Sequence, residues 1–449
     1  MEGDSKTTPF LPIAMLAFLF RCCCCLFILS LPWLDSTAHA SAPRCAALQQ
    51  HGSTLGIMHL YGPCSPFRLA KSWEETLLEM AAADEARLLY LTNLRSTRVI
   101  LPVGSGRQLL QSTTYIVRTN VGTPRQPMLM ALDISNDAAW VPCAGCVGCS
   151  RSVFDSSKSS TYSTLGCQAV QCKQVPNPSC AGSACSFNLT YGTSTVQANL
   201  SRDTFTFSND IVPNYAFGCL QHVTGGSVPP QGLLGLGRGP LSLLSQTQNL
   251  YHSTFSYCLP SFKSPNFAGS LKLGPIAQPK RIKYTPLLRN PRRPSLYYVN
   301  MIGITVGRRV VNIPPEVLAF NPATGAGTII DSGTVITRLV EPAYVAVRDV
   351  FRRRVNGTVT TLGGFDTCYV GPIRPPTITL HFVGMNVTLP LDNVMIHSTA
   401  GTISCLAMAA APLNVNSVVN VIASMQQQNH RVLFDVPNSR VGVSRELCS

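Results

Sequence analysis

The chain has 449 residues, of which 45% are hydrophobic and 12% are charged, with 33 glycines and 33 prolines. Single cores stop growing near about 250–300 residues, so a chain of this length is expected to form two lobes, and the absence of sustained heptads favours short strands over long helices. The formal net charge of +14 would suit a nucleic acid, but the arginines are scattered without interleaved aromatic residues, so we expect a basic solvated surface and no nucleic-acid partner.

Residues 1–40 contain an apolar stretch from Phe10 to Trp33 that ends in a small-x-small pattern at Ala38-His39-Ala40. This pattern predicts a signal peptide that is cleaved near Ala40. The sparse positive charge before the stretch and Arg21 within it leave a transit peptide or an uncleaved anchor open. No later segment is apolar and long enough to span a bilayer, so we expect no membrane contact in the mature form.

Cysteines and glycosylation sequons point to the same export route. Twelve of the 18 cysteines lie from Cys143 onward, an even number, as a disulfide framework in an oxidising compartment requires. Four N-x-S/T sequons are compatible with glycosylation of a secreted protein. They lie at Asn188, Asn199, Asn356 and Asn386.

Residues 41–104 differ from the rest of the chain. The run from Trp73 to Leu89 is rich in strong helix formers and has helical apolar spacing. A single amphipathic helix before a strand-rich region predicts a propeptide that covers a cleft until cleavage, with an exposed junction at Pro102–Gln111. The alternative is an N-terminal helix that only packs on the body.

From Tyr115 onward the sequence predicts an all-β region of short strands joined by turns. Helices are expected only near Leu241–Gln248 and Pro342–Val355. The strands are predicted at Tyr115–Val121, Met128–Leu132, Asp203–Phe207, Leu296–Ile302, Thr377–Phe382 and Arg431–Val436.

The strand-rich region carries a coarse internal repeat. An apolar strand ends at Asp133 and another ends at Asp331, and each is followed about 90–100 residues later by an apolar strand that ends in small residues. These later segments are Gly232-Leu-Leu-Gly-Leu-Gly and Asn420-Val-Ile-Ala-Ser. The repeat predicts an N-terminal lobe at 105–275 and a C-terminal lobe at 276–449, with one carboxylate from each at the seam.

Two carboxylates held close together cannot both ionise, because repulsion raises one pKa while the other stays low. Such a pair shares a proton, so that one carboxylate deprotonates water while its partner polarises a peptide carbonyl. A single Asp-Ser/Thr turn is common in proteins and carries little weight. Two such turns at matching places in a repeat predict peptide hydrolysis.

Three motifs resemble the plant pepsin-like aspartic proteases, closest to their atypical branch, which is nepenthesin-like and nucleoid-DNA-binding-protein-like. They are Asp133-Ile-Ser-Asn-Asp-Ala-Ala-Trp-Val-Pro-Cys, Asp331-Ser-Gly-Thr and Gly232-Leu-Leu-Gly-Leu-Gly-Arg-Gly-Pro-Leu-Ser-Leu. The resemblance implies a bilobal all-β pepsin-like fold with a central cleft and few short helices. It also implies roles for individual residues: catalysis by Asp133 and Asp331, a flap at Tyr191, Gly192 and Thr193 steadied by Trp140, and support of the dyad by Ser135, Ser332, Gly333 and Thr334.

Similarity to nepenthesins implies a disulfide pairing that uses all twelve cysteines: Cys143–Cys146, Cys149–Cys219, Cys167–Cys185, Cys172–Cys180, Cys258–Cys448 and Cys368–Cys405. The spacing of Cys143, Cys146 and Cys149 could be mistaken for an iron–sulfur motif, but export argues against thiolate ligands. We therefore expect no metal and no cofactor.

The first motif departs from the family at Ile134, where a Thr or Ser is usual. In the family this hydroxyl hydrogen-bonds across to the opposite loop, so one half of that lock is missing here, and Ser332 is expected to keep the other half. We therefore hold two hypotheses. One is a secreted endopeptidase of the apoplast that works at acid pH. The other is a catalytically weakened or inactive relative that acts by binding, as an inhibitor or a receptor.

The remaining expectations concern partners and location. Protein or peptide substrates and a monomeric state are expected, and acidic cell-wall polymers could be attracted to the basic surface. Chloroplast or vacuole is the alternative location, and DNA binding in plastids is a third hypothesis that rests on the branch resemblance and the net charge alone.

Overall fold

The computed structural model describes part of the chain. The described residues are 53–62, 65, 71–93, 115–149, 153–191, 194–226, 231–261, 269–276, 278–398, 401–412 and 417–448. All of them belong to one unit, Cys45–Ser449. The predicted signal peptide (1–40), the junction Pro102–Gln111, and Gly192 and Thr193 lie outside the described residues.

Strands dominate the described chain, as predicted. In the first half they are β1 (Thr54–His59), β2 (Tyr115–Val121), β3 (Gln126–Asp133), β4 (Trp140–Val147), β5 (Ser163–Thr164), β6 (Pro178–Ala181), β7 (Ala184–Tyr191), β8 (Ser194–Phe207), β9 (Asp210–Thr224), β10 (Leu233–Gly235), β11 (Thr254–Cys258) and β12 (Gly269–Leu273).

The second half contains the remaining strands. They are β13 (Lys283–Leu288), β14 (Tyr297–Val299), β15 (Met301–Val306), β16 (Arg309–Val310), β17 (Gly327–Ile330), β18 (Thr337–Leu339), β19 (Val359–Leu362), β20 (Phe365–Val370), β21 (Ile378–Phe382), β22 (Met385–Thr388), β23 (Met395–His397), β24 (Ile403–Leu406), β25 (Met408–Ala410), β26 (Val419–Ile422), β27 (His430–Asp435) and β28 (Arg440–Arg445).

Helices are few and mostly short. The α-helices are α2 (Trp73–Asn93), α3 (Leu243–Gln246), α4 (Gln248–Tyr251), α5 (Pro315–Leu318), α6 (Glu341–Arg352) and α7 (Ser424–Gln427), and the 3-10 turns are η1 (Ser156–Lys158), η2 (Val170–Gln174) and η3 (Leu391–Asn393). The three predicted helices correspond to α2, α3 and α6. None of these helices combines the length and apolarity that crossing a bilayer requires.

The strand pairing confirms the internal repeat. β3 runs parallel to β10, with Asp133 opposite Gly235, and β17 runs parallel to β26, with Ile330 opposite Ile422. Each of these second strands also meets an antiparallel neighbour, β4 and β18 respectively. Both halves therefore build the same local arrangement around a strand that ends at an aspartate.

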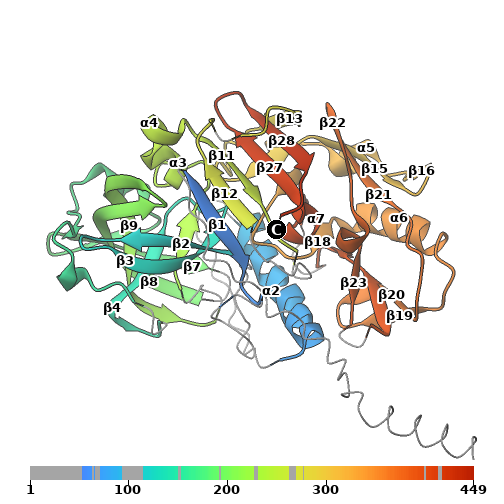
Figure 1. Cartoon of the computed structure of the whole chain (residues 1–449), viewed down its shortest axis with the longest axis horizontal. Helices are drawn as coiled ribbons and strands as arrows, with labels where there is room; N and C mark the ends of the chain where they lie inside the picture. Colours follow the sequence, from blue (N-terminus) through green and yellow to red (C-terminus); the bar gives the residue numbers. More distant parts are fainter. Residues whose placement is uncertain are drawn as a thin grey trace, which may run out of the picture. The chain divides into compact units, whose positions relative to one another are not determined.

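Strands from both halves join in one 20-stranded sheet. β11 pairs with β27 in antiparallel register, from Thr254 opposite Asp435 to Cys258 opposite Arg431. β1, which precedes the main strand-rich region, lies between β2 and β12 and pairs with both (Figure 1). The N-terminal segment thus contributes a strand to the sheet that the two halves share.

The helix α2 begins at a capping box, which is a strong helix-start signal. The Glu75 N–H donates to Ser72 Oγ at 3.2 Å, and the Ser72 N–H donates back to Glu75 Oε2 at 3.0 Å. One face of α2 buries Leu77 and Met80 against a cluster that includes Ile336, and Leu88 and Leu91 against a cluster that includes Tyr298 and Val421. The burial of this face places α2 on the C-terminal half of the molecule (Figure 1).

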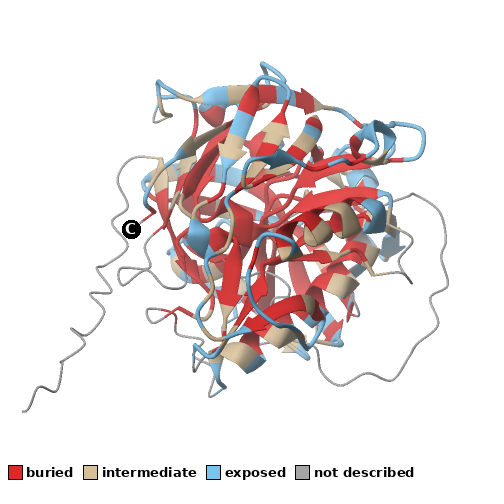
Figure 2. Cartoon of the chain, turned by 90° about the vertical axis from the view of Figure 1, so that its right-hand side faces the viewer, coloured by how far each residue is buried: buried red, intermediate tan, exposed pale blue. Residues whose placement is uncertain are grey.

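The strands form the buried interior, and exposed positions concentrate at turns and hairpin ends (Figure 2). One large apolar cluster runs through both halves, from Leu132 and Leu236 to Tyr297 and Phe434. A second cluster around Trp140 and Phe187 lies within the N-terminal half. Burial of this apolar area is the main force that holds the strands together.

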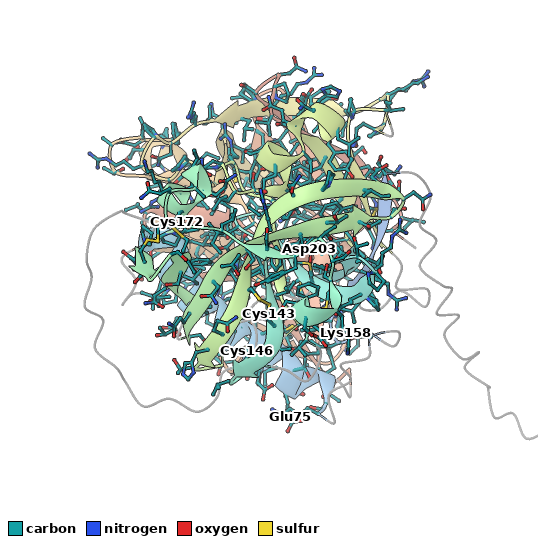
Figure 3. The ribbon with its side chains drawn as sticks, turned by 90° about the vertical axis from the view of Figure 1, so that its left-hand side faces the viewer. Glu75, Cys143, Cys146, Lys158, Cys172 and Asp203 are labelled. Atoms are coloured by element: carbon teal, nitrogen blue, oxygen red, sulfur yellow. A yellow bond between two sulfur atoms is a disulfide. The ribbon has the colours of Figure 1, made fainter. Side chains whose placement is uncertain are left out.

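The described residues contain six disulfides, and two of the predicted pairs are confirmed, Cys258–Cys448 and Cys368–Cys405. The other four predicted pairs, Cys143–Cys146, Cys149–Cys219, Cys167–Cys185 and Cys172–Cys180, are wrong. The bonds formed instead are Cys143–Cys219, Cys146–Cys149, Cys167–Cys180 and Cys172–Cys185. Figure 3 shows the face that carries Cys143, Cys146 and Cys172.

Strand register explains one part of this correction. β4 and β9 are parallel neighbours with Val141 opposite Cys219, which brings Cys143 within a Cα–Cα distance of 5.5 Å from Cys219. That separation lies in the range that a disulfide spans. Cys146 and Cys149 are then left to pair with each other, at a Cα–Cα distance of 5.7 Å.

Candidate active site

The two aspartates lie at equivalent strand ends and are fully buried. Asp133 is the last residue of β3, and Asp331 directly follows β17. Both side chains have 0% exposure. The sequence therefore placed both carboxylates correctly, at the seam between the two halves.

Tight turns supply hydrogen-bond donors to the Asp133 carboxylate. Its Oδ1 accepts from the Ser135 N–H and the Ser135 hydroxyl, both at 2.8 Å, and its Oδ2 accepts from Asn136 Nδ2 at 2.7 Å. The Leu236 N–H, just beyond β10, donates to the Asp133 carbonyl at 2.8 Å. This network fixes the position of Asp133 from both sides of the strand.

The turn after β17 does the same for Asp331. Its Oδ2 accepts from the Thr334 N–H at 2.8 Å and from the Thr334 hydroxyl at 2.6 Å. The Gln427 side chain donates to the Asp331 carbonyl at 2.9 Å and accepts the Tyr257 hydroxyl. Ser135 and Thr334 thus act as the resemblance implied, and Asn136 is an additional donor.

The Arg87 guanidinium of α2 lies between the two aspartates. Its Nη1 and Nη2 donate to Asp133 at 2.9 and 2.8 Å, and its Nε and Nη2 donate to Asp331 at 2.7 and 2.8 Å. Nη2 also lies 2.9 Å from Ser135 Oγ. Because one nitrogen bridges both carboxylates, they are separated by the width of a single guanidinium.

The glycine of the second motif makes room for Arg87. A Cβ atom at Gly333 would lie 2.2 Å from the Arg87 guanidinium, far inside contact distance. Gly333 therefore supports the site by leaving space next to Asp331, which refines the supporting role implied for it.

Arg87 changes the proton affinity of its partner. Burial alone would raise the pKa of Asp133, but the Arg87 charge, its hydrogen bonds and those from Ser135 together hold that pKa well below its usual range. Asp133 is thus ionised and ion-paired in this state. A carboxylate in this condition has no free oxygen to activate water.

A second charged residue of α2, Asp84, anchors the helix about one turn before Arg87. The Asp84 carboxylate accepts the Val335 N–H at 2.8 Å and the Ile336 N–H at 2.7 Å. Asp84 is 0% exposed, and burial raises its pKa to about 7 despite the opposing effects of Arg338, these two N–H bonds and Arg87.

Two arginines of the C-terminal half hold carbonyl groups of α2. Arg338 Nη2 donates to the Ala81 carbonyl at 2.8 Å, and Arg293 Nη2 donates to the Thr92 carbonyl at 2.6 Å. Both arginines are buried. The helix is therefore tied to the body along most of its length.

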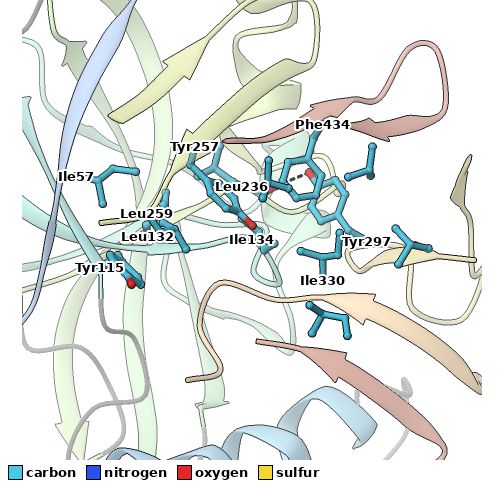
Figure 4. Packing of buried hydrophobic residues seen from close by; sticks show 14 of the residues in the cluster. Ile57, Tyr115, Leu132, Ile134, Leu236, Tyr257, Leu259, Tyr297, Ile330 and Phe434 are labelled. Atoms are coloured by element: carbon cyan, nitrogen blue, oxygen red, sulfur yellow. Dashed lines mark hydrogen bonds between the residues drawn. The ribbon is translucent and has the colours of Figure 1, made fainter. Parts of the chain in front are cut away.

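Ile134 lies in the main apolar cluster rather than beside a hydrogen-bonding partner. It is fully buried among Leu236, Tyr257, Tyr297 and Phe434 (Figure 4). The expectation that Ser332 keeps half of the family lock is wrong. The Ser332 hydroxyl is buried and has no hydrogen-bond partner among the described residues.

The remaining predicted positions have mixed outcomes. Trp140 begins β4 and is 1% exposed, within the second apolar cluster. Tyr191 ends β7, but the orientation of its side chain lies outside what the structure describes, so the flap stays a prediction. Asn188, Asn356 and Asn386 are exposed and Asn199 is half-buried, and their glycosylation also stays a prediction.

Sequence reasoning missed Arg87 and Asp84. The signal was available, because these charged residues are three positions apart on a helix whose same face carries Leu77, Met80 and Leu88. Charged residues within an apolar helix face require partners, and these partners lie between 46 and 252 positions away along the chain.

Within the described residues, no group of three or more His, Cys, Asp or Glu side chains is arranged to hold a metal ion.

Two family models match the chain, described as "Xylanase inhibitor N-terminal" over residues 115–275 and "Xylanase inhibitor C-terminal" over residues 296–445. Among curated proteins, the chain is 50% identical to Aspartyl protease AED3 of Arabidopsis thaliana, over 94% of this chain and 97% of the relative. It is 46% identical to Aspartyl protease 25 of Oryza sativa subsp. japonica, over 88% and 94%. Aspartic proteinase nepenthesin-1 of Nepenthes gracilis is 34% identical, over 74% and 78%.

Solved structures share the fold at low sequence identity. The structure of edgp matches with a TM-score of 0.60 and 22% identity, over 77% of this chain and 93% of that chain. The Basic 7S globulin from soybean matches with a TM-score of 0.60 and 22% identity, over 75% and 94%.

Proposed function

Because the chain belongs to the plant pepsin-like aspartic proteases of the atypical type, we propose that it is the precursor of a secreted endopeptidase that hydrolyses peptide bonds at acid pH. Asp133 and Asp331 are its catalytic pair. The single observation that supports this proposal best is the Arg87 guanidinium, which bonds both buried carboxylates at 2.7–2.9 Å and so occupies the place of the reaction.

The reaction uses the two carboxylates without a cofactor. When Arg87 leaves, the two carboxylates lose the positive charge that lay between them and face each other, so the pair takes up a proton to share. The ionised partner then accepts a proton from water while the protonated partner donates a hydrogen bond to the peptide carbonyl. Ser135, Asn136 and Thr334 hold the carboxylates in position during this change.

In this proposal residues 41–104 form a propeptide, and its helix α2 blocks the site until the junction is cut. Acid favours the release of α2, because protonation of Asp133 removes its ion pair with Arg87. The pKa of Asp133 is lowered by docking, so this contribution to docking is present above about pH 3.9 and is lost as the pH falls below it. The signal-peptide pattern and the even number of cysteines from Cys143 onward support an apoplastic location as part of this proposal.

The test is an acid-activation assay on the purified full-length chain. We expect the chain to be stable and inactive near neutral pH, and to cut itself and cleave denatured globin in a pepstatin-sensitive way between about pH 3 and 5. Asp133→Asn serves as the matched control, since it keeps the size of Asp133 and one oxygen that can accept from Ser135, but it cannot ionise. Cleavage by that variant, or none by the wild type, would contradict the proposal.

A second candidate function is binding without catalysis, as an inhibitor- or receptor-like protein. It is favoured by Ile134 and by the unpaired hydroxyl of Ser332, because both halves of the lock between the catalytic turns are absent among the described residues. The descriptions of the two matching family models also refer to an inhibitor. Protein that is correctly processed and folded but cleaves no substrate would favour this candidate.

A further inference from the structure

The binding site of Asp84 is built almost entirely from the C-terminal half. Two successive main-chain N–H groups, those of Val335 and Ile336, converge on its carboxylate at 2.8 and 2.7 Å. Both residues follow Asp331 closely in the chain, in the segment that leads to β18. Charge-assisted hydrogen bonds from paired N–H groups make a strong and directional carboxylate site.

Arg338 supplies the positive charge of the same site. It lies in β18, is 8% exposed, and its charge lowers the pKa of Asp84 against the effect of burial. One guanidinium nitrogen donates to the Ala410 carbonyl of β25 at 3.3 Å, which holds the side chain in place without α2. Another donates to Ala81 of α2 at 2.8 Å, and Nε–H has no partner among the described residues.

Departure of α2 therefore leaves three donors without acceptors. The donors are the N–H groups of Val335 and Ile336 and the Nη2 of Arg338. Among the described residues, each of them donates only to an acceptor in α2. Once α2 has left, these donors face the opened cleft and require new acceptors, and any donor that finds none is costly. The site that held Asp84 is then ready for another carboxylate.

We propose that the mature enzyme carries a carboxylate-binding subsite formed by Val335 N–H, Ile336 N–H and Arg338, and that it selects substrates with an acidic side chain near the cleaved bond. This inference rests on the proposed proteolytic function. Asp84 occupies the subsite in the precursor in the same way that Arg87 occupies the catalytic pair.

The distance between the carboxylate subsite and the catalytic pair indicates which side chain of the substrate the subsite binds. Asp84 and Arg87 are three residues apart on one helix face, where such Cβ atoms lie about 5–6 Å apart. An extended substrate advances about 3.3 Å per residue. The acidic side chain is therefore expected one or two residues from the cleaved bond.

The test compares matched peptides on protein whose N-terminal segment has been cut by an unrelated protease, at a recognition site introduced into the Pro102–Gln111 junction. One cleavable peptide is made with Asp or Asn at each position within three residues of the cleaved bond. We expect a kcat/KM ratio of Asp to Asn of about ten or more at one position, near pH 5. The ratio should approach one below about pH 3, where the peptide Asp is protonated and Arg338 is still charged.

Two variants separate this role from a structural one. Arg338→Gln should bring the Asp to Asn ratio close to one, whatever it does to the absolute rates. Arg293→Gln is the matched control, since Arg293 also holds a carbonyl of α2 but lies at the other end of the helix, and it should leave the ratio as in the wild type. Equal loss of both peptides in Arg338→Gln, with the ratio kept, would overturn the inference.

Binding provides a readout that is independent of catalysis. Dissociation constants of the same peptides are measured on cut Asp133→Asn protein, and the Asp peptide should bind about tenfold more tightly than its Asn partner. Equal binding refutes the subsite. Absence of cleavage by the wild type, combined with preferential binding, refutes the proposed proteolysis and supports the subsite.

Discussion

Ser332 is a hydroxyl that the structure buries and leaves unpaired, although it directly follows Asp331. Its expected counterpart, Ile134, packs among aromatic and aliphatic side chains (Figure 4). Ile134 makes apolar contacts where the family has a hydroxyl that hydrogen-bonds to the opposite turn. The position of each aspartate therefore depends on the hydrogen bonds within its own turn. Thr334 then matters more for Asp331 than Ser332 does.

Ser332→Ala and Thr334→Ala form a matched pair that tests this view. Ser332→Ala removes an unpaired buried hydroxyl, so the free energy of unfolding should stay the same or rise by up to about 1 kcal/mol. Thr334→Ala removes a donor to a buried carboxylate and should lower it by about 1–3 kcal/mol. Denaturant unfolding of the full-length chain measures both, and a larger loss for Ser332→Ala than for Thr334→Ala would contradict the prediction.

The hydrogen-bonding roles of Ser135 and Thr334 were predictable because each lies in the same short turn as the aspartate that it bonds. Ser135 and Thr334 bond to aspartates two and three positions before them, within a single turn. The loss of the Ser332 bond was not predictable, since it depends on what packs opposite the turn. The contacts of Arg87 join residues that are 46 and 244 positions apart, which no local pattern reveals.

The helix α2 is the element that decides whether the carboxylates are accessible. Its helical apolar spacing was readable from the sequence and is confirmed, whereas the capping box of Ser72 and Glu75 was not predicted. The strands were predictable because the alternation of apolar and polar residues and the enrichment in β-branched residues are local features of the sequence. The disulfide pairs were not, because they depend on register, such as Val141 of β4 standing opposite Cys219 of β9.

Removal of the Arg87 guanidinium should release α2 at a higher pH. Arg87→Met leaves two buried carboxylates without a counter-ion, which costs about 3–5 kcal/mol in the docked state. We expect the variant to process itself at least about one pH unit above the wild type, as followed by gel analysis across a pH series. Arg87→Lys keeps the positive charge but cannot bond both carboxylates as the guanidinium does. We expect it to process itself at a pH between those of the wild type and Arg87→Met. Processing of Arg87→Met at the wild-type pH would contradict this role.

At the scale of the whole molecule, three groups change how strongly the N-terminal segment docks as the pH falls, and they do not all act in the same direction. The lowered pKa of Asp133 weakens docking only below about pH 3.9. The raised pKa of Asp84, about 7, acts in the other direction, since the docked state gains a proton as the pH falls from about 7. Among the described residues of the N-terminal segment, His59 of β1 is a group that destabilises docking at mild acidity.

His59 is buried among aromatic rings and accepts the Tyr61 N–H at Nδ1, 3.2 Å away. Burial lowers its pKa to about 4, so the folded state disfavours its protonated form. The stability that neutral His59 contributes is present above about pH 6.5 and is lost as the pH falls from there toward 4. Protonation would also remove the acceptor for Tyr61.

His59→Gln should therefore shift the opening of the N-terminal segment to lower pH. Hydrogen exchange of the β1 amides, measured against pH in Asp133→Asn protein to prevent self-cleavage, reports this opening. His430→Gln is the matched control, because burial lowers the pKa of His430 to about 4 as well, but this residue lies in β27 outside the segment. An unchanged onset of β1 exchange in His59→Gln would exclude His59 as the sensor.

The position of β1 between β2 and β12 has a consequence for the lifetime of the processed protein. A chain that is cut at the junction and stripped of its N-terminal segment has lost a strand that carries Leu55 and Ile57 into the main core. Its two former neighbours become free edges. We expect the lifetime of such a molecule to depend on a low rate of unfolding rather than on a favourable free energy of unfolding. Processing would therefore limit the lifetime of the protein as well as expose its carboxylates.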